Sequence, residues 1–180
     1  MNMKQKVDAL RELSHNFHCN QAIVFSDEGN LGDVKNIYDE EQDREWRKKP
    51  SGLWFSLGAS WISWFGNPYS GPDTWALKRL QWITHIYRIY LAKSVLKIYT
   101  VEEFDKFEKE YARTNKKGVN WRKVAQQYDG ILIRHQKNRG IDDSHWYNGW
   151  DVSGGCMWRR SGIRGTKLLK AWRSVWKEVA

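Results

Sequence analysis

The sequence predicts an α+β fold, a single domain in which a mixed or antiparallel sheet is flanked by helices. Short runs rich in β-branched and aromatic residues alternate with segments whose apolar residues recur every three or four positions. These segments lack the regular strand–helix–strand repetition of a doubly wound parallel sheet. A chain of 180 residues is long enough for one domain with a core of its own.

Composition supports a folded chain. Twelve Trp, eight Tyr and six Phe supply large apolar surface, although the mean hydropathy is −0.76. No apolar run approaches the roughly 20 residues needed to span a bilayer, and the charged first residues lack the apolar centre of a signal peptide. We therefore expect no membrane association and a cytoplasmic protein.

The spacing of the histidines and cysteines indicates neither a metal site nor a disulfide framework. The five histidines form no HxxxH or HxH pair, so we expect no metal site. Cys19 and Cys156 are too few and too far apart for a disulfide framework, and we expect both to be buried thiols.

In the first third of the chain, an amphipathic helix over 4–17 should precede a buried strand over 21–26. Residues 38–49 are almost wholly charged and predict an exposed loop or short helix. A second strand should open after Pro50 and run to Ser56. Trp61 and Trp64, three positions apart, suit one buried helix face.

A loop over 66–72 and a short helix opened by Asp73 come next. Two β-rich runs over 86–91 and 95–99 predict a hairpin or a bulged strand.

The second half begins with a helix over 100–111. Thr100 and Glu103 have the spacing of a capping box that opens this helix. Asn120 should cap another helix, and Asp129 before Gly130 should turn the chain into a strand over 131–133. A last strand over 152–158 and an apolar stripe in a basic tail complete the pattern. The single domain 1–180 therefore consists of an N-terminal helix (1–20), a core (21–165) and a basic C-terminal helix (166–180).

Charge is unevenly distributed. Residues 1–60 hold 8 basic and 10 acidic side chains, for a net −2, whereas 61–180 hold 22 and 11, for a net +11. The densest basic set predicts contact with an acidic macromolecule, either nucleic acid or an acidic protein. A solvated tail helix is the alternative. The basic residues that we assign to this contact are Arg159, Arg160, Arg164, Lys167, Lys170 and Arg173.

The stretch 49–56 has the residue types of a flat-ligand site: a strand that opens after Pro and Gly, carries large apolar side chains and ends on a hydroxyl. The candidate ligand-binding residues are Gly52, Leu53, Trp54, Phe55 and Trp61. Plain core packing is the competing interpretation for the aromatic members.

The string Gly52 to Ser56 resembles the second-strand motif of ADP-ribosyltransferase-type domains, which helps to hold the nicotinamide of NAD. The order of the strands 87–91 and 95–99 and the helix 100–111 is similar to the middle of those folds. The segment 150–164, in which an acidic residue opens a strand that ends near an Ile-Arg pair, is similar to their last motif. The chain also resembles uncharacterised phage-encoded proteins, which implies a host cytoplasm.

The resemblance implies an ADP-ribosyltransferase-like fold that consumes NAD as substrate, without a metal, and modifies a protein or nucleic acid. Cleavage of the glycosidic bond needs a carboxylate near developing positive charge and an aromatic wall for the leaving ring. By analogy Asp151 and Ser56 are the catalytic residues. Asp129 is the competing carboxylate, although before Gly130 it suits a turn.

Three departures from the family pattern are visible. The first strand offers Phe25 and Ser26 where the family carries a His or Arg. The second motif has Trp54 where Tyr is commoner, and the acid is Asp151 rather than Glu. The alternatives are a non-catalytic, Trp-rich nucleic-acid-binding module and an inhibitor or adaptor that uses aromatic surface.

Overall fold

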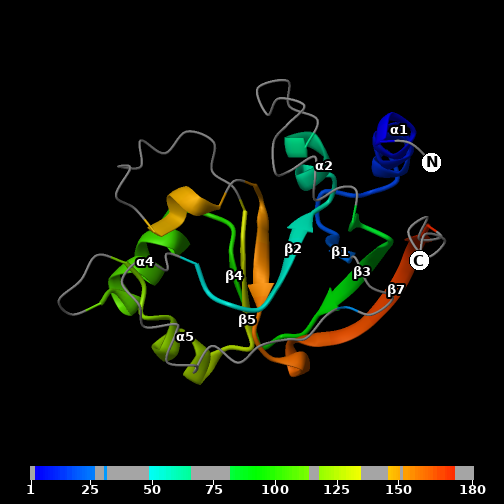
Figure 1. The fold of residues 1–180 in the computed structure, drawn as a ribbon. Coiled ribbons are helices and arrows are strands. Elements are labelled where there is room, and N and C mark those ends of the chain that lie inside the picture. Colours follow the sequence, from blue (N-terminus) through cyan, green and yellow to red (C-terminus); the bar gives the residue numbers. More distant parts are fainter. Residues whose placement is uncertain are drawn as a thin grey trace, which may run out of the picture. The chain divides into compact units, whose positions relative to one another are not determined.

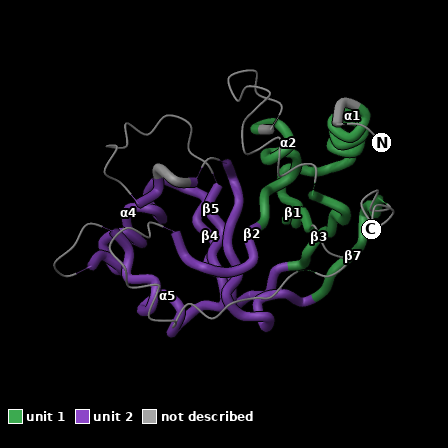
Figure 2. The backbone as a smooth tube through the Cα atoms, in the orientation of Figure 1, with its two compact units in different colours: residues 1–32, 55–90, 165–180 green, residues 33–54, 91–164 purple. Residues whose placement is uncertain are grey.

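The computed structural model describes residues 3–26, 31, 49–65, 82–113, 118–134, 146–150 and 152–172. The chain divides into two compact units (Figure 2). Unit 1 comprises residues 1–32, 55–90 and 165–180, and unit 2 comprises 33–54 and 91–164. Each unit therefore combines segments that are far apart in the sequence.

Unit 1 packs two helices against antiparallel strands (Figure 1). Helix α1 (Met3–Ser14) precedes β1 (Ala22–Ser26), and α2 (Ser60–Phe65) follows β2 (Leu53–Leu57). Strand β1 lies between β2 and β3 (His85–Leu91) and is antiparallel to both, and β7 (Ile163–Ala171) follows β3 in the strand order. The helix predicted over 4–17 and the strand predicted over 21–26 are present.

Apolar side chains from α1, α2 and one face of these strands form the core of unit 1. In the register of β1 and β3, Phe25 lies opposite Ile86, so both point to the same face. Leu10 and Ile62 bury their side chains in this cluster, as the helical spacing predicts. Trp61 and Trp64 are half-buried and pack against this cluster.

Unit 2 combines three strands with helices (Figure 1). Strand β5 (Gly130–Ile133) runs parallel to β4 (Val95–Ile98) and antiparallel to β6 (Gly154–Met157). Helices α4 (Val101–Tyr111) and α5 (Trp121–Gln127) pack against these strands, and two 3-10 helices, η3 (Trp146–Gly149) and η4 (Arg160–Gly162), flank β6 in the chain. The predicted mixed sheet with helices is confirmed.

The core of unit 2 is unusually aromatic. Phe104 on α4 stacks on Trp146 with ring centroids 5.4 Å apart, and Trp121 on α5 meets the same indole edge-on at 5.4 Å. Trp158 is 1% exposed, and its indole N–H donates to the carbonyl of Tyr128 at 2.7 Å. Buried aromatic rings carry much apolar area per residue. The tryptophans buried in this core are Trp121, Trp146, Trp150 and Trp158.

Both predicted helix caps are present. The hydroxyl of Thr100 accepts from the backbone N–H of Glu103, while the carboxylate of Glu103 accepts from the N–H of Thr100. Asn120 accepts from the N–H of Lys123 at the start of α5. These bonds satisfy N–H groups that have no partner inside the helix.

Two predictions of local structure are wrong. Strands β3 and β4 do not form a hairpin, because β3 pairs with β1 and β7 while β4 pairs with β5. The basic C-terminal helix predicted over 166–180 is a strand as far as residue 171, since β7 runs to Ala171. The N–H of Trp172 donates to the carbonyl of Thr84 at 2.8 Å, so hydrogen bonds to distant residues outweigh the helical spacing of the apolar residues.

Several predicted elements lie outside the described residues. They are the charged loop 38–48, the Gly-Pro loop 66–72, the helix after Asp73 and the tail beyond 172. Within the described part of the chain, no helix has the length and apolarity to cross a membrane.

Candidate functional site

Gly52, the first residue of the flat-ligand motif, owes its identity to backbone geometry. Its φ is +150°, which L side chains rarely adopt. A Cβ at this position would overlap the carbonyl oxygen of Met157 and lie 2.9 Å from Sγ of Cys156. Packing against β6 is therefore a sufficient reason for glycine here.

Phe55 and Ser56 are buried. Phe55 is 1% exposed and Ser56 is 0% exposed. The Ser56 hydroxyl lies 3.5 Å from the carbonyl oxygen of Ile23, its antiparallel partner in β1, at the long limit of a hydrogen bond. Neither side chain has surface with which to touch a ligand in this conformation.

Leu53 and Trp54 are only half-buried, so they are the accessible part of the motif. The edge of Trp54 meets Trp150 with ring centroids 4.9 Å apart, and the ammonium of Lys49 lies 5.3 Å from the Trp54 centroid. Such a cation over an indole is attracted by the negative face of the ring. An aromatic wall beside a cation suits a flat, negatively charged ligand.

Of the two further proposed site residues, the structure describes only Trp61. Trp61 stacks on Phe25 at the core of unit 1, with centroids 6.0 Å apart and planes 7° from parallel. Asp151 lies outside the described residues. Its neighbour Trp150 is buried, and the indole N–H of Trp150 has no hydrogen-bond partner among the described residues. Burial of an unpaired donor costs free energy, which the surrounding aromatic packing must offset.

Asp129, the competing carboxylate, lies where the chain bends into β5, as its place before Gly130 predicts. Its carboxylate and its carbonyl each have several hydrogen-bond partners. Its carboxylate accepts from the hydroxyl of Ser94 at 2.7 Å and pairs with Arg159 at 3.3 Å. Its carbonyl accepts the backbone N–H groups of Trp158 and Arg159, each at 3.1 Å. Asp129 therefore fastens the start of β5 to the end of β6.

The pKa of Asp129 reflects these contacts. Burial alone would raise it, but hydrogen bonds from Ser94, Ser161 and Arg159, together with the charge of Arg159, lower the pKa below its ordinary value. The carboxylate is thus ionised at neutral pH and engaged by its neighbours. Arg159, predicted as a partner-binding residue, instead contributes to this intramolecular cluster.

The other basic residues of the predicted contact are accessible where described. Arg160 is exposed in η4, and Arg164, Lys167 and Lys170 are exposed on β7. Arg173 lies outside the described residues. Because β7 is a strand, its side chains alternate between the two faces of the sheet, unlike the single stripe that a helix would present.

Tyr90 and Arg88 were not singled out from the sequence, yet they lie beside this basic strand. Tyr90 is 41% exposed, and the Arg88 guanidinium carbon lies 4.7 Å from its ring centroid. A Cβ at Gly165 of β7 would approach Tyr90 to 3.8 Å, an ordinary contact. Gly165 and Tyr90 therefore share a face, and strand alternation adds Lys167 to it. The sequence signal that could have identified this pair is the two-residue spacing of Arg88 and Tyr90, which puts both side chains on one face of a strand.

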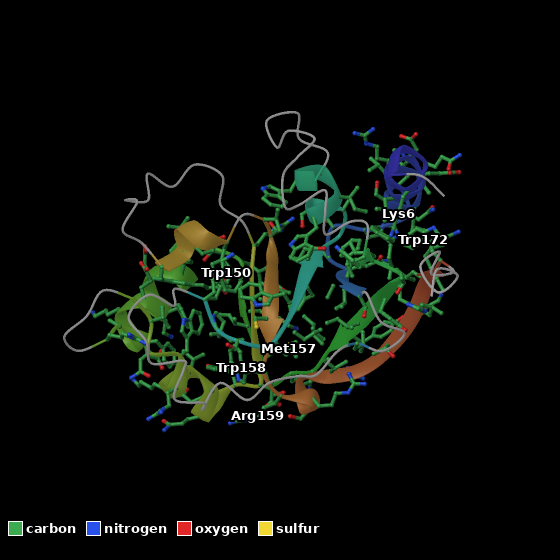
Figure 3. All side chains as sticks on the ribbon, viewed as in Figure 1. Lys6, Trp150, Met157, Trp158, Arg159 and Trp172 are labelled. Carbon is green, nitrogen blue, oxygen red and sulfur yellow. The ribbon has the colours of Figure 1, made fainter. Side chains whose placement is uncertain are left out.

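Trp172, just after β7, lies between two lysines of unit 1. Figure 3 labels Lys6 and Trp172. The ammonium of Lys6 on α1 is 5.7 Å from the Trp172 ring centroid, and that of Lys170 is 6.0 Å away. Lys6 is 8% exposed, and burial lowers its pKa. Lys6 therefore serves packing, whereas Lys170 remains at the surface.

The two thiols differ. Cys156 is buried in β6 as predicted, but Cys19 is exposed, which corrects the expectation that both are buried. Burial raises the pKa of Cys156 well above its usual value. Among the described residues, no group of three or more His, Cys, Asp or Glu side chains could hold a metal ion.

No protein-family model matches the sequence, and neither the curated proteins nor the solved structures contain a significant match.

Proposed function

We propose that unit 1 binds single-stranded nucleic acid along strands β3 and β7. One observation carries the proposal: these neighbouring strands display exposed cations and an exposed tyrosine, and neither contains an acidic residue. On the face that carries Tyr90 of β3, the accessible cation of β7 is Lys167, with Arg88 half-buried beside Tyr90. Lys170 is exposed on the opposite face of β7.

The chemistry of single strands matches this combination. Cations neutralise backbone phosphates and release counterions, while an aromatic face stacks on bases irrespective of sequence. The net charge of +9 adds a long-range attraction for a polyanion. The absence of carboxylates from both strands removes the local repulsion that phosphates would otherwise meet.

Edge protection is the structural alternative for the lysines. Exposed Lys residues on an edge strand discourage pairing with other chains, and β7 stands at one end of the strand order. The two roles differ in their consequences. Loss of edge protection promotes self-association, whereas loss of phosphate contacts weakens binding and reduces its dependence on salt.

The experiment is a titration of a fluorescently labelled oligothymidine with the full chain, followed by anisotropy at several salt concentrations. Affinity should fall steeply with salt, and the variant Lys167→Gln should reduce the slope of log K against log salt by about 0.7, since each single-strand phosphate contact contributes roughly 0.7.

The control variant Lys106→Gln removes one exposed charge from α4 and should keep most of the slope. If both variants lose the same amount of slope, the effect comes from net charge and not from a contact at β7. If the unmodified protein does not bind at low salt, the proposal is refuted. Size-exclusion chromatography of both variants detects self-association from lost edge protection.

ADP-ribosyl transfer from NAD is the second candidate, supported by the sequence resemblance and by half-buried Trp54 with Lys49 beside it. It predicts release of nicotinamide from NAD, measured by chromatography. Trp54→Ala and Asp151→Ala should each abolish release, while Ser56→Ala should leave it intact because that hydroxyl is buried. Absence of release by the unmodified protein would remove this candidate.

A further inference from the structure

Arg88 and Tyr90 on β3 form a cation–aromatic pair that leaves one face of the tyrosine ring for a planar ligand. Arg88 and Tyr90 are two residues apart, so they point to the same face of the strand, and the guanidinium carbon lies 4.7 Å from the ring centroid. A guanidinium over the face of a tyrosine is attracted by the ring quadrupole. One face of the Tyr90 ring is therefore covered by Arg88, and a planar ligand can stack only on the other.

Part of the Tyr90 side chain is accessible beside β7. Tyr90 is 41% exposed, and the neighbouring residue of β7 toward its ring is Gly165, which has no side chain. Lys167, two residues farther along β7, projects to the same face and is exposed. A flat group on Tyr90 would thus lie near an ammonium that can meet an adjoining phosphate.

We propose that Tyr90 is a stacking platform for a single unpaired base, with Arg88 holding its ring and Lys167 contacting a neighbouring phosphate. The inference rests on the proposed binding of single-stranded nucleic acid and names the contact that favours single over double strands. In a duplex the base faces are occupied by their neighbours, so they cannot stack on an outside ring. Fixing the ring before binding lowers the entropy cost of the stack.

The pair Tyr90→Leu and Tyr90→Phe tests the stack. Leucine removes the π face and should weaken binding of oligothymidine about tenfold, in the range of one base–aromatic stack, without changing the salt slope. Phenylalanine keeps the face and should bind like the unmodified protein. The matched control is Tyr99→Leu, which removes a tyrosine of similar exposure (43%) after β4 and should bind normally.

A photochemical measurement locates the contact independently of affinity. An oligothymidine with one 5-iodouracil is irradiated in complex with the full chain, and peptide mass spectrometry should place the cross-link on Tyr90. A duplex of the same length should compete poorly for the labelled single strand.

The outcomes separate the two proposals. If the unmodified protein does not bind the oligonucleotide at low salt, the proposed function fails and this inference with it. If binding is intact but Tyr90→Leu binds within twofold of the unmodified protein, or the cross-link lies elsewhere, only the stacking role is refuted. Circular dichroism of each variant shows whether a loss of binding follows from misfolding. If Tyr90→Leu misfolds, the position of the cross-link in the unmodified protein decides the question.

Discussion

Gly52 packs against the main-chain carbonyl of Met157, so no side chain fits at position 52. This contact changes the interpretation of the motif that begins there. The glycine and the buried Phe55 and Ser56 all satisfy packing requirements, and Leu53 and Trp54 are the residues of the motif whose side chains keep accessible surface. A local string that resembles a ligand clasp can thus be explained largely by the close approach of two strands.

The first prediction concerns this contact. Gly52→Ala should destabilise the protein more than Gly118→Ala, because both glycines have a positive φ but only Gly52 lacks space for a Cβ. The backbone strain alone costs roughly 1–3 kcal/mol, and the overlap with Met157 adds about as much again. Urea denaturation of both variants measures the difference, and equal losses would show that packing at Gly52 is unimportant.

The second prediction concerns acid stability. The pKa of Asp129 is lower in the folded than in the unfolded state, so the unfolded chain takes up the proton first as pH falls. The stability from this carboxylate is present above its unfolded pKa, near 4, and is lost as pH falls through the folded value. Asp129→Asn should therefore be less stable at pH 7 and should lose less stability between pH 5 and pH 2 than the unmodified protein.

The matched control for that variant is Asp105→Asn, which replaces an exposed carboxylate on α4. Its free energy of unfolding at pH 7 should stay closer to that of the unmodified protein than that of Asp129→Asn. Urea denaturation at a series of pH values measures all three proteins. A wild-type-like pH profile in Asp129→Asn would contradict the role given to the contacts with Ser94 and Arg159.

The third prediction concerns thiol reactivity. In the native state Cys19 should react promptly with a thiol reagent, whereas Cys156, which is 0% exposed and has a raised pKa, should react only on unfolding. Cys19→Ser should accordingly show no fast-reacting thiol, and urea should restore one equivalent. Fast labelling of Cys156 would indicate that β6 opens readily.

The fourth prediction concerns the start of α4. Thr100→Ala removes the hydroxyl that accepts from the N–H of Glu103 and should lower the free energy of unfolding by about 1 kcal/mol. Thr100→Ser keeps a hydroxyl in the same place and should lose much less. The comparison by thermal or urea denaturation isolates the cap, and similar losses in both variants would assign the effect to the methyl group instead.

Elements governed by neighbours in the sequence were predictable. Thr100 and Glu103 cap α4 because the bonds join residues three positions apart, and Phe104 and Phe107 are buried together because helical spacing puts them on one face. The turn at Asp129 was also predictable from its place before glycine. Its contacts with Ser94 and Arg159 were not, since they join residues 35 and 30 positions away.

The sequence by itself therefore determined the helix caps, the aromatic helix stripes, the β-rich runs and the basic second part of the chain. Only the tertiary structure decided that residues 166–171 pair with β3 as a strand, that Ser56 has no accessible surface, and that Tyr90 lies next to Gly165. The physical reason is the distance along the chain between the residues that interact. Caps and helical stripes depend on contacts within one or two turns, whereas strand pairing and burial depend on segments that only folding brings together.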